Sequence, residues 1–314
     1  MSCTASPTRG SSTASVTVIG RSASRVGAGG RLLGQRPSLW RRLASNRRVV
    51  VGSTVVFALA AVGLLAPLVS PADPEAQVLI DRLQAPGLRH LLGTDGLGRD
   101  MLSRAIYGAR VSLSVGLVAM AISITIGSAM GLVAGYVGGR IDNLLMRIVD
   151  VFISIPIFFL LIAVLSIYGS SLQLLIIFLG LSAWPGTARL VRSVVLSLRT
   201  TEFVTAAQAV GARGTRIMLR HILPNVAPVI IVSATLRVGA VILQESALSY
   251  FGLGVQPPTA TWGNMVADGR IVLDVAWWVS TIPGVLIVLT GLAFNFAGDG
   301  LRDVLDPRRR SSSE

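Results

Sequence analysis

The sequence predicts an all-α membrane protein with six transmembrane helices, on three observations: its composition, its long apolar stretches and the placement of its arginines. Of 314 residues, 52% are hydrophobic and 14% are charged, and the mean hydropathy is +0.69. A soluble domain usually carries about 25% charged residues. The length could hold two soluble domains, but this composition favours a helical bundle embedded in lipid.

Six apolar stretches are each long enough to cross a hydrocarbon core of about 30 Å. They are expected at residues 49–69, 111–137, 144–168, 172–195, 226–248 and 275–296. The predicted organisation is a tail at 1–48, a first helix at 49–69, an external loop at 70–110, a core of five helices at 111–298 with a cytoplasmic loop at 196–225, and a tail at 299–314. The first tail is rich in Ser, Gly and Arg and is expected to be disordered.

The arginines predict the orientation. All basic residues are Arg, and the net charge is +13. Nine arginines precede residue 49, a second group lies at 189–220, and three lie at 308–310. Because cytoplasmic segments of membrane proteins are enriched in basic residues, both termini are expected in the cytoplasm. The clusters also suit anionic lipid head groups, and no motif for nucleic-acid binding accompanies them.

Cysteine and histidine are too scarce for a disulfide or a metal site. The chain holds only Cys3, and its two histidines, His90 and His221, belong to different loops. Glu245 is expected near the outer end of the fifth span and Asp150 near the inner end of the third. These opposite depths argue against an intramembrane protease with paired carboxylates, and Asp150 is interpreted as an interfacial residue.

Two spans carry residues that predict close packing and a kink. Ser123, Gly127, Gly131 and Gly135 recur at four-residue spacing, so they share one helical face on which another backbone could approach closely. Internal packing is preferred here to a role in a transport pathway. Pro156 removes a backbone hydrogen bond and should kink the third span.

Arg237 lies roughly 11 residues into the fifth span, which at about 1.5 Å per residue places it near mid-membrane. A charge at that depth is costly and normally faces water or the protein interior. One hypothesis is that Arg237 lines a pathway and meets a substrate carboxylate. The alternative is that it pairs with an acid or with carbonyl groups at a subunit interface.

The loop between the fourth and fifth spans predicts a short helix lying across the membrane surface. Thr201 is a plausible N-cap, and Glu202 suits the positive end of the helix. Gly211 permits the left-handed turn that ends a helix, and Pro224 suits the first turn of the fifth span. The residues at i, i+3, i+4 and i+7 form one small apolar face: Phe203, Ala206, Ala207 and Val210. This shape would fit a groove on another protein.

This loop resembles the cytoplasmic EAA signature of ABC importer permeases, whose short coupling helix docks on an ATP-binding subunit. The positions that match its spacing are Ala206, Ala207, Gly211, Leu223 and Pro224. Thr205 stands where the signature often has Glu, and His221 stands where Ile is common. Because Thr205 carries no charge, any salt bridge that a Glu would make at this position is not expected here.

Other stretches resemble the second ("C") permease of dipeptide and oligopeptide transporters. They occur in the expected order at 90–100, 103–104, 108–113, 150–156, 245–254, 256–258, 262–264, 298–303 and 306–307. The resemblance extends over nearly everything from about residue 45 to 310. It implies the type I ABC importer permease fold and a multi-pass protein of a bacterial inner membrane.

The resemblance also implies a division of labour among subunits. This chain would form a pathway with a homologous permease, above two ATP-binding subunits or one with two ATPase domains, and an extracytoplasmic binding protein would deliver dipeptides or oligopeptides. It would itself hold no catalytic residue, metal or cofactor, because ATP and Mg would bind to the ATPase subunits. Membrane lipids are further expected partners.

The implied sites fall into three groups. Contact with the ATPase is expected from Glu202, Phe203, Ala206, Ala207, Val210, Gly211 and Arg213. Contact with the binding protein is expected from Thr94, Asp95, Gly98, Arg99 and Asp100, although these could equally form a capped turn leading into a short helix. The pathway or the permease interface is expected to include Arg237, Glu245 and Pro156.

Three other classes of protein fit the sequence less well. A secondary transporter would need ion-coupling groups near the membrane centre, where only Arg237 is clearly placed, and internal repeats, which are not evident. A membrane enzyme would need a His or Cys constellation, and the chain offers none. A structural scaffold would not require the helix that Gly211 ends.

Overall fold

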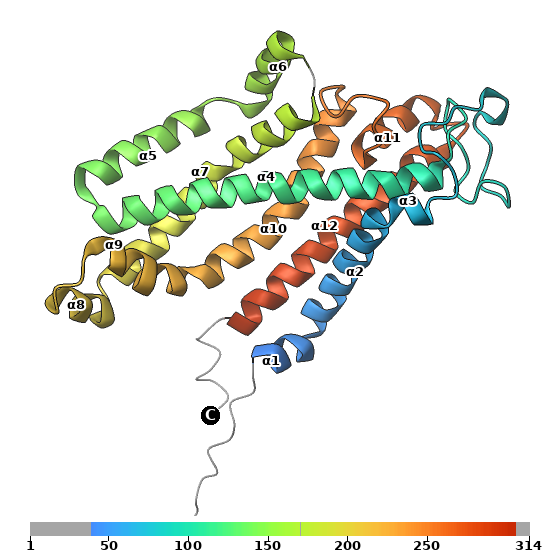
Figure 1. Cartoon of the computed structure of the whole chain (residues 1–314). Coiled ribbons are helices and arrows are strands. Elements are labelled where there is room, and N and C mark those ends of the chain that lie inside the picture. The colour runs from blue at the N-terminus through green and yellow to red at the C-terminus, as the bar shows by residue number, and fades with distance from the viewer. Residues whose placement is uncertain (1–38, 170, 306–314) are drawn as a thin grey trace, which may run out of the picture. The chain divides into compact units, whose positions relative to one another are not determined.

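The computed structural model describes residues 39–169 and 171–305, so most of the predicted tail at 1–48 and the arginines at 308–310 lie outside the described residues. No strand occurs among the described residues, which form helices and connecting loops (Figure 1). The helices are α1 (Leu39–Ser45), α2 (Arg47–Leu64), α3 (Ala66–Val69), η1 (Leu79–Asp81), α4 (Met101–Val137), α5 (Gly139–Ser154), α6 (Ile157–Tyr168), α7 (Leu172–Arg199), α8 (Glu202–Ala209), α9 (Gly214–Ile217), η2 (Met218–Ile222), α10 (Leu223–Tyr250), α11 (Trp262–Gly269), η3 (Arg270–Val272) and α12 (Trp277–Leu305).

Five helical runs are long and apolar enough to cross a membrane, namely α2, α4, α7, the run from α9 through α10, and α12. A sixth span is formed if α5 and α6 are taken together, although they are bent by 81°. Ile155 is extended with ψ 119°, as expected for a residue before proline, and Pro156 then precedes the first residue of α6. The expected kink at Pro156 is therefore a complete break between two helices.

The second span begins earlier than hydropathy predicts. One carboxylate oxygen of Asp100, Oδ2, accepts a hydrogen bond from the backbone N–H of Ser103 at 2.8 Å and caps α4. The helix therefore starts at Met101, ten residues before the apolar run at 111. A polar cap, which a hydropathy window ignores, sets this boundary.

The glycines of the second span pack against α7, as the sequence predicts. A Cβ atom built on Gly131 would lie 2.5 Å from the carbonyl oxygen of Ala188, and one on Gly135 would lie 2.8 Å from Cβ of Val195. Because no side chain intervenes, the two backbones approach closely over several turns. This contact is the most extensive one between helices in the described chain.

The first and last spans also pack closely through a glycine. A Cβ atom on Gly52 of α2 would lie 2.5 Å from the carbonyl oxygen of Ala293 in α12. Asn46 caps α2, and its side-chain amide donates to the carbonyl of Gly300 at 3.3 Å. Figure 1 shows α2 beside α12, with α8 and α9 at the end of the bundle where α4 finishes, and α11 with the loop before α4 at the opposite end.

Candidate functional site

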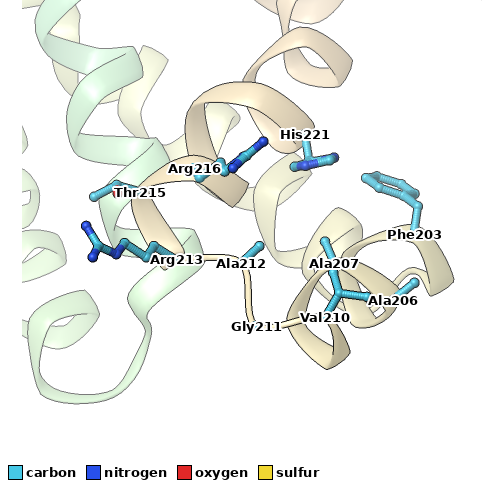
Figure 2. A pocket seen from close by; sticks show the side chains of 10 residues that line it. All are labelled: Phe203, Ala206, Ala207, Val210, Gly211, Ala212, Arg213, Thr215, Arg216 and His221. Carbon is cyan, nitrogen blue, oxygen red and sulfur yellow. The ribbon is translucent and has the colours of Figure 1, made fainter.

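The main candidate site is an open groove at the end of the bundle, formed by α8, α9 and η2 (Figure 2). Its volume is about 900 Å³, and it is lined by Phe203, Ala206, Ala207, Val210, Gly211, Ala212, Arg213, Thr215, Arg216 and His221. All the residues expected to contact an ATPase line this groove except Glu202, which is exposed in the first turn of α8. The expected set lacked four residues that line the groove, namely Ala212, Thr215, Arg216 and His221, because it was centred on the first of the two short helices.

The helix α8 is fixed to the bundle by residues on its inner side. Val204 is fully buried and Ala207 is 8% exposed, and both join a cluster with Ile217 and Ile222. Phe203 and Val210, by contrast, are 41% and 84% exposed. The four residues of the predicted apolar face therefore all line the groove, but they are unequally exposed: Ala207 also packs on the bundle, whereas Phe203 and Val210 remain open to a partner. The i, i+3 spacing of Val204 and Ala207 was the available signal for the buried side.

Both ends of α8 lie where the sequence predicts, but only one is capped as expected. Thr201 occupies the N-cap position, yet its hydroxyl donates to the carbonyl of Leu198 at 2.6 Å and does not cap the helix. Gly211 has φ 76°, in the left-handed region. Its backbone N–H donates to the carbonyl of Gln208, and the backbone N–H of Ala212 donates to the carbonyl of Ala207. This paired arrangement is a Schellman motif. It turns the chain sharply and defines one edge of the groove.

The charged and titratable residues that line the groove are basic. Arg213 and Arg216 are exposed and form no ion pair with another described residue, and His221 is half-buried. No carboxylate of the described residues lines the groove. Thr205, which stands where the signature often has Glu, is exposed and does not line it. An apolar floor beneath unpaired guanidinium groups suits a partner that presents an apolar side chain beside carboxylates.

The second group of candidate residues lies at the opposite end of the bundle and is almost entirely buried. Thr94, Asp95, Arg99 and Asp100 have exposed fractions of 0%, 2%, 5% and 6%. Asp100 caps α4 and also lies 2.9 Å from Nδ1 of His90. The structure thus has the capped turn that was one of the two alternatives, but it leads directly into α4 and not into a separate short helix.

Around Asp95, an ion-pair network joins this loop to two helices. Its carboxylate accepts a 2.6 Å hydrogen bond from Nε of Arg99 and lies 3.6 Å from Nε of Arg104 in α4. Asp268 of α11 lies 3.3 Å from Arg99 and 3.9 Å from Arg104. Burial raises the pKa of the Asp268 carboxyl above its usual value, and the positive charges of Arg104 and Arg99 oppose this rise. Sequence reasoning missed Asp268, because 169 residues separate it from Arg99.

Gly98 of the same loop is required by backbone geometry. Its φ is 74°, and a Cβ atom there would overlap the carbonyl oxygen of Val78. The loop is therefore folded tightly on itself. Its exposed apolar side chains, including Ile80 at 89% and Leu88 at 102%, lie outside the predicted set.

The third group is not brought together in the structure. Arg237 lies in the middle of α10, and Pro156 lies at the break between α5 and α6. Glu245 is fully buried and accepts hydrogen bonds from the hydroxyls of Ser249 at 2.7 Å and Thr261 at 3.2 Å. Since Thr261 also caps α11, Glu245 links α10 to the start of α11. Asp150 forms a 2.7 Å ion pair with Arg189.

The long apolar helices define a multi-pass membrane protein, and an open groove lies at one end of its bundle. Comparison with known proteins gives its family: residues 123–311 match the model for the binding-protein-dependent transport system inner membrane component. Residues 38–86 match the N-terminal transmembrane domain of oligopeptide transport permease C. The chain therefore belongs to the family of binding-protein-dependent transport permeases. It is a subunit of a bacterial ABC importer. Importers of this class are assemblies that also contain another permease and ATPase subunits.

Named relatives align over most of their length. The chain is 42% identical to the dipeptide transport system permease protein DppC of Bacillus subtilis, over 88% of each chain. It is 40% identical to the oligopeptide transport system permease protein OppC of Haemophilus influenzae, over 87% of this chain and 90% of the relative. An inward-facing structure of the MetNI methionine ABC transporter shares the fold with a TM-score of 0.56 and 24% identity, over 66% of this chain and 98% of that one.

Proposed function

We propose that this chain is the C-type permease of an ATP-driven importer of dipeptides or oligopeptides. It forms the translocation pathway with a homologous permease and receives an ATPase subunit in the groove of α8, α9 and η2. ATP and Mg bind to the ATPase subunits, so this chain carries no cofactor and no catalytic residue. The named dipeptide and oligopeptide permeases that it resembles over nearly 90% of its length support the substrate class.

The groove is the observation that carries the docking proposal. Phe203, Ala206 and Val210 present an exposed apolar surface, while Val204 and Ala207 bury the other side of α8 in the bundle. A partner that pushes on α8 therefore pushes on packed helices and not on a loose loop. Such a rigid contact can pass a conformational change from one subunit to another.

The arginines support the orientation. Arg41, Arg42, Arg47 and Arg48 lie beside the start of α2, and Arg213, Arg216 and Arg220 lie beside the groove. We place both ends of the described chain and the groove in the cytoplasm, because cytoplasmic segments are enriched in Arg. The loop before α4 then faces the outside. There, contact with a substrate-binding protein would fall on exposed residues such as Ile80 and Leu88, while Asp95, Arg99 and Asp100 hold the loop in shape from within.

Two matched substitutions on α8 test the docking site. Ala206 and Ala209 are both exposed, but only Ala206 lines the groove. We expect Ala206→Glu to lose the ATPase during co-purification from membranes and to abolish peptide uptake, and Ala209→Glu to retain both. Ala207 is a poor position for this test, because a charge on a residue that is 8% exposed would damage the bundle itself.

Purification of the wild-type chain and a transport assay distinguish an ABC importer from a secondary transporter. If the wild-type chain purifies alone and transports in liposomes without ATP, it is a secondary transporter and the importer proposal is wrong. If Ala206→Glu retains the ATPase in the same amount as Ala209→Glu, the importer proposal stands but the groove is not the docking site.

A further inference from the structure

Arg237 is a cation at the middle of the bundle without a partner among the residues that the structure describes. It lies midway along the 28 residues of α10 and forms no hydrogen bond or ion pair with another described residue, and its Nε is buried. Its Nη2 lies against Gly186, midway along the 28 residues of α7: a Cβ atom built there would be 3.4 Å away. The missing side chain of Gly186 leaves room for the half-buried guanidinium group.

The carboxylates in the described membrane-crossing helices do not supply this partner. Asp142 is bonded to Arg192, Asp150 is paired with Arg189, and Glu245 is bonded to hydroxyl groups. Asp299 and Asp303 lie in the last turns of α12. A charged group at mid-membrane depth is costly against lipid, so the face that carries Arg237 must meet water or an anion from outside the described helices.

Other polar residues continue this face along α10. Ser233 and Gln244 lie four residues before and seven residues after Arg237, which places all three on one side of the helix. Both side chains are half-buried and form no hydrogen bond with another described residue. A helix that faced only lipid would not carry three such groups on one side.

The neighbouring helix α7 adds to the polar surface. Ser182, Arg189 and Ser193 lie on the same side of α7 as Gly186, at spacings of three or four residues. The two serine hydroxyls donate to carbonyls of their own helix, at 2.8 and 2.7 Å, and keep their acceptor capacity for a ligand. Arg189 is neutralised by Asp150, whereas Arg237 is not.

We propose that this face of α10 and α7 is a wall of the translocation pathway, and that Arg237 binds the terminal carboxylate of a peptide in transit. This inference rests on the proposed peptide-import function and identifies the chemical group that is recognised. A guanidinium group offers a planar fork of donors that matches a carboxylate. The hydroxyl and amide groups of Ser233 and Gln244 would replace water around the peptide backbone.

The first experiment asks whether water reaches this face in the assembled transporter. The chain contains one cysteine, Cys3, so single cysteines at Ser233 and Gln244 can be introduced into a Cys3→Ser background. Controls are Ile231→Cys and Leu243→Cys, at apolar α10 positions that are 47% and 61% exposed. A charged, water-soluble thiol reagent should modify the first pair at least about tenfold faster than the second. Equal rates, or slower rates at Ser233 and Gln244, would overturn the proposal.

The second experiment asks what Arg237 binds. Uptake by the complete transporter is compared for one peptide with a free C-terminal carboxylate and for the same peptide amidated. We expect Arg237→Met to reduce uptake of the free peptide about tenfold more than that of the amidated one, and Arg237→Lys to restore part of the loss. Arg302→Met, an exposed position in the last turn of α12, should change neither.

The alternative occupant is a carboxylate of the second permease. In that case Arg237→Met would reduce uptake of both peptides equally and weaken co-purification of the two permeases, which would overturn the substrate site while leaving the proposed function intact. If the wild-type transporter imports neither peptide, the proposed function fails and the carboxylate site fails with it.

Discussion

Asp142 of α5 and Arg192 of α7 form a two-point ion pair: the guanidinium Nε and Nη2 atoms donate to the two carboxylate oxygens at 2.5 and 2.6 Å. A second pair, Asp150 with Arg189, joins the same two helices, and Val149 packs beside Trp184 and Ala188 between them. The break at Pro156 separates α5 from α6. The attachment of α5 to the bundle therefore depends strongly on these few contacts.

The first prediction concerns that attachment. Arg192→Met should destabilise α5 by about 1–2 kcal/mol, because it removes a partly buried, bidentate charge-assisted contact. Arg189→Met should destabilise α5 by less than about 0.5 kcal/mol, since the side chains of Arg189 and Asp150 are both about half exposed. Hydrogen exchange of the α5 amides in detergent measures the difference, and equal protection in both variants would contradict it.

Arg104 provides the second prediction. Its side chain is 1% exposed, between Asp95 and Asp268. Arg104→Met should lower the stability of the chain by about 3 kcal/mol, because it leaves buried carboxylate charge with less compensation. Arg89 forms an ion pair with Asp81, but its side chain is 74% exposed. Arg89→Met should therefore lower the stability of the chain by less than about 1 kcal/mol. Thermal unfolding followed by size-exclusion chromatography compares the two, and similar melting temperatures would refute the assignment.

The third prediction concerns the packing of α4 on α7. Gly131→Ala should destabilise the chain by about 1–3 kcal/mol, because the new Cβ atom would lie 2.5 Å from a backbone oxygen of α7 and the helices would have to separate. Gly284→Ala in α12 is the matched control, with no atom within 4 Å of the new Cβ. It should be neutral or slightly stabilising. Unfolding in detergent tests both, and a stable Gly131→Ala variant would show that the helices are not in close contact.

The fourth prediction concerns the loop before α4. Gly98→Ala would place a side chain at φ 74° and against the carbonyl of Val78, so we expect a loss of about 2–4 kcal/mol. Gly96→Ala, two residues away, meets nothing within 4 Å and should have little effect. Limited proteolysis of the loop is the measurement. Cleavage at the same rate in both variants would argue against the tight fold.

The fifth prediction tests the charge of the groove. Arg213→Glu with Arg216→Glu should weaken ATPase co-purification by at least about tenfold, because acidic groups on the partner would meet like charge. Arg220→Glu changes a nearby exposed arginine that does not line the groove and should have a smaller effect. The binding should also weaken at high salt in the wild type. A salt-independent interaction would mean that apolar contacts alone hold the partner.

Local chemistry explains what the sequence predicted correctly. The apolar stretches define the spans because lipid cannot satisfy an exposed backbone, so each crossing must be a helix with an apolar surface. Gly211 ends α8 because the turn there needs a φ of 76°, which glycine adopts without strain. The four-residue spacing of Gly131 and Gly135 indicates a close contact with another helix. The family motifs, which depend on short runs of residues, were equally visible.

The tertiary structure decided which side of each element is buried. The sequence shows that Phe203, Ala206, Ala207 and Val210 share helical spacing, but only the packing of Val204 and Ala207 on Ile217 and Ile222 determines which of them remain free to meet a partner. Likewise, Asp95 and Arg99 look like exposed loop charges until Arg104 and Asp268 enclose them. Both outcomes depend on contacts between residues far apart in the chain, and local spacing does not identify the residues on the other side of those contacts.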